Sequence, residues 1–131
     1  MVQSKALVCN NLSEDMSFVQ LEILDLSDPE ENEVLIQVKA ASVNFPDLLM
    51  TKGMYQHKPK LPFVLGMEGS GVVNKIGSKV TKVKEGDEVT FGAMGKGAFS
   101  EYVVVGENSV AIKPSTLNFS EAAAFQTAYL T

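Results

Sequence analysis

Short runs of β-branched and aromatic residues, separated by turn-forming residues, recur along most of the chain. The pattern is clearest in 34–40, where Val34, Ile36 and Val38 fall on one face of an extended strand. Further runs of this kind are 5–9, 18–24, 69–76, 88–91, 99–105 and 110–113. Many short strands at close spacing are typical of a β-barrel or sandwich, and 131 residues suit one domain. We therefore predict a single, mainly β domain.

Residues 18–24 show the same alternation of side chains. Val19, Leu21 and Ile23 alternate with Phe18, Gln20 and Glu22. A period of two predicts a strand with one face inward and the other in solvent.

Two short helices interrupt the strands. Pro46 suits the first turn of a helix, and Gly53 is placed to end it in a left-handed conformation. Asn118 and Glu121 have the spacing of a capping box before an alanine-rich segment. The chain ends at Thr131 inside this second helix, which carries the apolar residues Phe125, Ala128, Tyr129 and Leu130. We expect that helix to lack a packing partner within the chain, and the sequence to be a fragment.

Charge and composition argue against several classes of partner. Sixteen acidic side chains against 11 basic ones give a net charge of −5, which disfavours binding to nucleic acid or to anionic membrane surfaces. The sequence has no apolar stretch of the roughly 20 residues needed to span a membrane. The single cysteine, Cys9, fits a reducing compartment. We expect a cytoplasmic protein.

Metal and phosphate sites are disfavoured by the residues available. The chain has one histidine, His57, and one cysteine, whereas zinc prefers three or four nitrogen and sulfur ligands. The glycine segments 69–74 and 95–100 lack the third glycine of a dinucleotide fingerprint and open no predicted helix, so we interpret their glycines as turn or strand-packing residues. His57 is expected to lie in a solvated loop.

Several short motifs follow one another in a fixed order from about Lys5 to the end of the chain. They are Ala-Ser-Val-Asn-Phe-Pro-Asp at 41–47, Gly-Met-Tyr at 53–55, Pro-Phe-Val-Leu-Gly-Met-Glu-Gly-Ser-Gly-Val-Val at 62–73, Val-Lys-Glu-Gly-Asp-Glu-Val at 83–89, Gly-Ala-Phe-Ser-Glu-Tyr at 97–102 and Ala-Ala-Ala at 122–124, with Thr-Ala-Tyr at 127–129. This order resembles the N-terminal, GroES-like catalytic domain of the medium-chain dehydrogenases/reductases. The resemblance implies a partly open β-barrel with short helices, without the family's Rossmann domain.

Departures from that pattern indicate the subfamily. Zinc-dependent alcohol dehydrogenases of the superfamily have a catalytic Cys in place of Asn44 and a His in place of Met67. Their cysteine-rich lobe is also missing, because 91–97 leads directly to the next strand. The chain therefore resembles the zinc-free quinone oxidoreductase branch, also called zeta-crystallin-like, and no metal site is expected.

The resemblance implies catalytic roles for Asn44 and Tyr55. In this branch the asparagine lies in the cleft near the nicotinamide and the substrate, where its amide can donate to a developing oxyanion. The alternative is that Asn44 caps the helix that starts at Pro46. Tyr55 matches a cleft tyrosine that can donate a hydrogen bond or proton to a quinone oxygen. Its alternative is a partly buried packing residue.

Other positions are implied to line the cleft. Leu49 and Met67 are expected in the substrate pocket, and Thr127 matches a threonine that faces the nicotinamide carboxamide. For Thr127, an ordinary helical position is an equal alternative. Three carboxylates within the motifs are expected to be structural rather than catalytic: Asp47, Glu68 and Glu101.

The resemblance implies an enzyme in which hydride passes from NADPH to a quinone or to an α,β-unsaturated carbonyl compound. Residues 1–131 would form its catalytic domain, ending in the helix that leads to a missing nucleotide-binding domain. A homo-oligomer is expected. The alternative from another class is a stand-alone barrel that works as a binding or co-chaperonin-like module.

Overall fold

Two antiparallel sheets and two short helices make up the fold. The computed structural model describes the backbone of residues 1–130 and the side chains of residues 1–125. The strands are β1 (Val2–Cys9), β2 (Val19–Leu26), β3 (Glu33–Ala41), β4 (Phe63–Val64), β5 (Glu68–Ile76), β6 (Glu88–Gly92), β7 (Tyr102–Gly106) and β8 (Val110–Ile112), and the helices are α1 (Phe45–Thr51) and α2 (Phe119–Leu130), with one 3₁₀ turn at Glu107–Ser109. The mainly β prediction is confirmed.

The larger sheet carries the main core. Its strand order is β7-β3-β5-β6-β8, and the smaller sheet has the order β2-β1-β4. The alternation predicted for 34–40 does not hold at the start of β3, because Leu35 is buried between the completely buried Val34 and Ile36. A register shift against β5 falls between Leu35 and Ile36. Phe91 is the largest fully buried side chain and belongs to the same cluster. Gly71 lets β5 approach β3 closely, because a Cβ there would lie 2.1 Å from the Gln37 carbonyl oxygen.

The small sheet joins the large one through hydrogen bonds between β1 and residues 99–101, and no continuous ladder closes the barrel within the described residues. Leu7 donates to the Phe99 carbonyl at 2.8 Å, and Glu101 donates to the Lys5 carbonyl at 2.9 Å. The run predicted as one strand over 99–105 is therefore divided between two partners: residues 99–101 bind β1, and β7 pairs with β3. The partly open barrel expected from the motifs is confirmed.

A serine side chain also connects the two sheets. The Ser4 hydroxyl accepts from the Tyr102 backbone N–H at 3.0 Å and lies 3.2 Å from the Tyr102 carbonyl oxygen. Within the part of the chain that the structure describes, no regular ladder joins β1 and β7.

The side of β2 that carries Leu21 and Ile23 faces solvent. Leu21 and Ile23 are 67% and 66% exposed, whereas Leu24 and Leu26 are half-buried. The period of two holds from Leu21 onward, where Glu22, Leu24 and Leu26 are half-buried, whereas at the start of the strand Val19 is half-buried and Gln20 is exposed. This orientation follows from the pairing with β1, in which Leu24 lies opposite the buried Ser4.

Both helix ends predicted from local signals are present. α1 begins after Asn44, and Gly53 has a φ of +70°, as expected for a left-handed cap. At the start of α2, Glu121 donates its backbone N–H to Asn118 Oδ1 at 2.8 Å, and Glu121 Oε1 accepts from the Asn118 N–H at 3.0 Å. The predicted capping box is confirmed.

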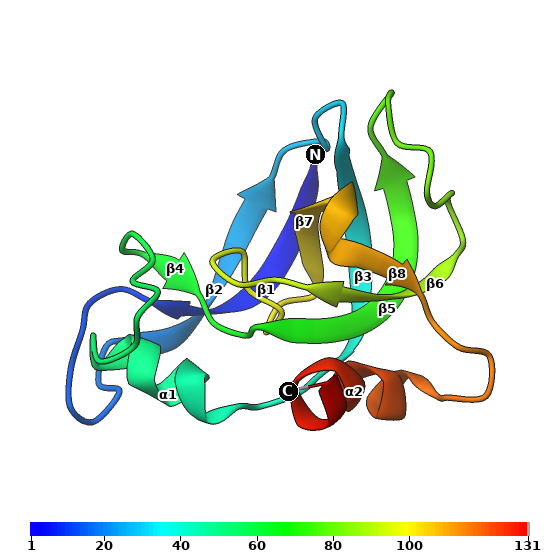
Figure 1. Ribbon diagram of the computed structural model, residues 1–131. Helices are drawn as coiled ribbons and strands as arrows, with labels where there is room; N and C mark the ends of the chain where they lie inside the picture. Colours follow the sequence, from blue (N-terminus) through cyan, green and yellow to red (C-terminus); the bar gives the residue numbers. More distant parts are fainter. Residues whose placement is uncertain (131) are drawn as a thin grey trace.

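The expectation that α2 would find no partner within the chain is wrong for its first turns. Figure 1 shows α1 and α2 on the same side of the sheets. Ala122 and Ala123 are 1% and 3% exposed, and α2 packs on β3 and β5. Small side chains let the helix backbone come close enough for the Ser70 hydroxyl to donate to the Phe119 carbonyl at 2.5 Å. The side chains of Tyr129 and Leu130 lie outside the described residues.

The approach to α2 is fixed by one buried lysine. Lys113 is 8% exposed, and its ammonium donates to the Leu117 carbonyl at 2.5 Å and pairs with Glu88 at 3.2 Å. It also lies 5.4 Å from the centre of the Phe119 ring.

Neither helix within 1–130 is long and apolar enough to cross a membrane.

Candidate functional site

The ends of two paired strands bring Asn44 and Met67 to the same end of the large sheet. In the β3–β5 ladder, Ala41 lies opposite Gly69. Asn44 follows β3 by three residues, and Met67 immediately precedes β5. The two positions that distinguish this chain from its zinc-dependent counterparts are thus neighbours in the fold.

Asn44 is half-buried at the N-cap of α1. It forms a capping box with Asp47, whose Oδ2 accepts from the Asn44 backbone N–H at 2.7 Å. Its side-chain oxygen faces the Asp47 N–H, and its amide nitrogen donates to the Ser42 hydroxyl at 3.4 Å. The Asp47 N–H donates to the Asn44 backbone carbonyl at 3.0 Å, with the side-chain oxygen facing the same N–H. The position at the start of α1 expected as the alternative is therefore present, and the amide nitrogen remains directed toward Ser42.

Asp47 is a buried carboxyl group beside the site. It is 4% exposed, and its Oδ1 has no hydrogen-bond partner among the described residues. Burial raises the pKa of its carboxyl group, which the N–H groups of Asn44 and Gly66 oppose and the charge of Glu68 reinforces. Its contact with the Asn44 N–H fits the structural role expected from the sequence, which stays a prediction.

Ser42 connects three parts of the fold. Its hydroxyl lies 2.6 Å from Glu68 Oε1, 3.1 Å from the Ala123 carbonyl oxygen and 3.4 Å from Asn44 Nδ2. Glu68 is 3% exposed at the start of β5, and Ala123 belongs to α2. We did not predict Ser42 or Glu68 as functional residues. The sequence signal for Ser42 was its two-residue spacing from Asn44, because residues two apart in an extended segment share a face.

Tyr55 and Met67 lie on one small hydrophobic cluster. Both are half-buried and pack against the buried residues Cys9, Met50, Phe63 and Leu65. The packing role expected as the alternative for Tyr55 is thus present, and a catalytic role stays a prediction. Leu49 is half-buried in α1. The side chain of Thr127 lies outside the described residues.

No group of three or more potential ligands from His, Cys, Asp and Glu is present within the described side chains. His57 is exposed in the loop after α1, as predicted. Cys9 is fully buried and donates its thiol to the Asn11 carbonyl at 3.2 Å. Burial raises the pKa of this thiol, and the contact with Asn11 opposes the rise.

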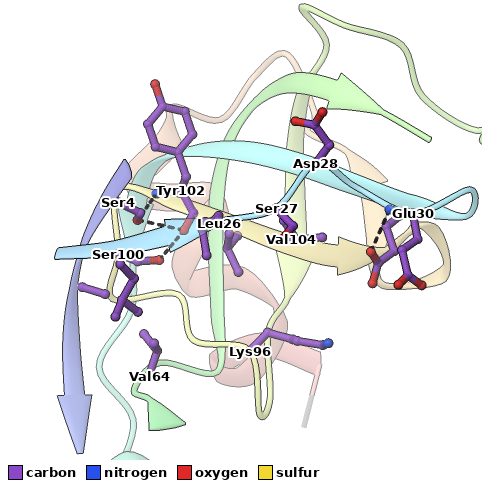
Figure 2. Close-up of a pocket in the computed structure, with 14 residues that line it drawn as sticks. Ser4, Leu26, Ser27, Asp28, Glu30, Val64, Lys96, Ser100, Tyr102 and Val104 are labelled. Carbon is purple, nitrogen blue, oxygen red and sulfur yellow. Dashed lines mark hydrogen bonds between the residues drawn. The ribbon is translucent and has the colours of Figure 1, made fainter. Parts of the chain in front are cut away.

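A cavity of about 290 Å³ lies away from this site, between β2, β7 and the loop before β7. Figure 2 shows the Ser4 and Ser100 hydroxyls turned toward the Tyr102 main chain. Among the described side chains, none of those predicted for the cleft lines it. Because its serine hydroxyls are already bonded to the main chain, we assign it no role.

The fold and motifs agree with known proteins. Residues 30–115 match the family described as the alcohol dehydrogenase GroES-like domain. Over 98 residues, 75% of this chain and 30% of the relative, the sequence is 39% identical to quinone oxidoreductase 1 of Escherichia coli. The chain spans about a third of the length of the curated relatives it matches.

Solved structures agree closely. The quinone oxidoreductase from Coxiella burnetii superposes with a TM-score of 0.89 at 30% identity, covering 99% of this chain and 43% of that one. The Escherichia coli quinone oxidoreductase complexed with NADPH gives 0.78 at 31% identity, covering 93% and 36%. The chain therefore belongs to the GroES-like domain family of the alcohol dehydrogenases, in the quinone oxidoreductase branch of the medium-chain dehydrogenases/reductases.

Proposed function

We propose that this domain forms the substrate side of an NADPH-dependent oxidoreductase that reduces a quinone or an α,β-unsaturated carbonyl compound. The observation that carries the proposal is the Asn44 amide. Its oxygen faces the start of α1, and its nitrogen donates to the Ser42 hydroxyl at the end of β3. A neutral N–H donor held in a half-buried position suits an oxygen that gains negative charge.

Bound NADPH would supply a hydride, and the residues of this chain would provide orientation, hydrogen bonding and exclusion of water. Asn44 would donate to the substrate oxygen or to the nicotinamide carboxamide, and Thr127 would face that carboxamide from α2. Tyr55 would donate a hydrogen bond or proton to the reduced oxygen. Leu49 and Met67 would form apolar walls beside a planar substrate.

These residues fit the nicotinamide end of the cofactor better than its phosphates. The glycines of 69–74 lie in β5, and those at 95–97 lie in the loop after β6, so neither segment opens a helix. The pyrophosphate and the choice of NADPH over NADH would therefore depend on residues outside this domain.

The proposal is tested by joining residues 1–131 to the nucleotide-binding half of the Escherichia coli quinone oxidoreductase. The chimera should oxidise NADPH when 1,4-benzoquinone is added, followed at 340 nm. Asn44→Ala should lower kcat/KM by about 10- to 1,000-fold, the range for loss of one oxyanion donor. An Asn44→Ala chimera as active as its parent would contradict the role of this amide.

A second candidate is a stand-alone binding module, favoured by the way β3 and β5 cover Ala122 and Ala123. Residues 1–131 alone would then bind a quinone without NADPH, which calorimetry with 1,4-benzoquinone would detect.

The cytoplasmic location and homo-oligomeric state also stay proposals. Cell fractionation would test the first, and analytical ultracentrifugation the second.

A further inference from the structure

The orientation of the Asn44 amide is set by groups outside the helix that it caps. The backbone at Asn44 is extended, with φ −124° and ψ 154°, so its side chain lies on the same side as that of Ser42. Asn44 Nδ2 and Ser42 Oγ are 3.4 Å apart, and Ser42 Oγ is 2.6 Å from Glu68 Oε1. The three side chains form a row from the end of β3 to the start of β5.

The direction of the hydrogen bonds in this row follows from the protons available. The Ser42 hydroxyl carries one proton, and the short contact with a carboxylate is the stronger place for it. Its lone pairs are then left to accept from Asn44 Nδ2. If the proton turned to the Ala123 carbonyl, 3.1 Å away, the lone pairs would still face the amide.

A reversed amide would lose both of its contacts. Asn44 Oδ1 would face the Ser42 lone pairs, and the amide N–H₂ would face the backbone N–H of Asp47. Two donors placed together repel, and the Ser42 hydroxyl could donate to Asn44 Oδ1 only by giving up its 2.6 Å contact with Glu68, so this row favours the orientation in which Nδ2 faces Ser42.

We propose that Ser42, held by Glu68, is a positioning residue for Asn44. It turns the amide so that the second N–H of Nδ2, rather than the carbonyl, is offered to the substrate oxygen or to the nicotinamide carboxamide. Its catalytic meaning rests on the function proposed above, whereas the orientation itself is a property of this chain.

The orientation is tested by NMR on ¹⁵N-labelled residues 1–131. In Ser42→Ala, the Asn44 side-chain amide should shift, and its exchange with water should speed up by roughly two- to tenfold, the factor for one net hydrogen bond. Ser42→Thr keeps the hydroxyl and should restore the wild-type exchange rate. Glu68→Gln removes the charge while keeping the shape, and should give a smaller change in the same direction.

Ser100→Ala is the matched control, because its hydroxyl bonds the Gly97 and Tyr102 carbonyls and does not contact Asn44. It should leave the Asn44 amide unchanged. An unaltered Asn44 amide in a folded Ser42→Ala protein would overturn the proposal, and so would failure of Ser42→Thr to restore it. An inactive chimera with a Ser42-sensitive amide would remove the proposed function and leave the positioning intact.

Discussion

The hydroxyl of Ser70, completely buried in β5, donates a 2.5 Å hydrogen bond to the carbonyl oxygen of Phe119 at the start of α2. Ser70→Ala removes this bond without creating a large cavity, so the free energy of unfolding should fall by about 1 kcal/mol. Urea denaturation followed by circular dichroism measures the change. Ser78→Ala, at an exposed serine, should change stability little, and equal losses in both variants would argue against this attachment of α2.

Asp47 should make stability depend on pH in a defined direction. Its pKa is raised in the folded state, so ionisation is less favourable there than in the unfolded chain. The group's contribution is fully present below its unfolded pKa and is lost as pH rises through the higher folded pKa. The free energy of unfolding of Asp47→Asn, relative to that of wild type, should therefore be higher at neutral pH than in acid. Urea midpoints at several pH values test this, and a difference independent of pH would contradict it.

Cys9 should react slowly in the folded protein. The thiolate is the reactive form, and burial both raises the thiol pKa and blocks access. Ellman's reagent should label it many times faster in denaturant than in native buffer. Equal rates would show that β1 and β2 open readily around this residue.

The exposed face of β2 should tolerate polar replacement. Leu21→Thr and Ile23→Thr should each change the free energy of unfolding by no more than about 0.5 kcal/mol, as expected for exposed positions. Ile36→Ala, in the core, should cost roughly 2–5 kcal/mol. Thermal unfolding of the three variants would compare them, and a large loss at Leu21 would mean that this face is covered in solution.

Zinc should be absent from the purified protein, because Asn44 and Met67 stand where the zinc-dependent enzymes have ligands. Elemental analysis should find no stoichiometric metal, and EDTA should leave the melting temperature unchanged. One tightly held zinc per chain would contradict this prediction.

The features predictable from sequence were those set by neighbouring residues. Pro46 and Gly53 bracket α1, and Asn118 with Glu121 starts α2, because caps act within one turn. Strand β4 was not predicted, since two residues carry no periodicity and Phe63 is fixed by Cys9, far away in the chain.

The candidate site was only partly predictable for a similar reason. Asn44 and Met67 could be identified from motifs, but the contact of Ser42 with Glu68 joins two strands and becomes visible only in the fold. The position of Asn44 at the start of α1 was predictable as an alternative, because caps act locally. The sequence could not show that its amide nitrogen contacts Ser42 while its oxygen faces the start of α1.

The link between β1 and β7 depends on one side chain rather than on a main-chain ladder. The Ser4 hydroxyl accepts from the Tyr102 N–H and lies beside the cavity. Replacing Ser4 would therefore remove this contact, whereas the ladder between β3 and β5, next to Ser42 and Glu68, consists of main-chain hydrogen bonds that do not depend on it.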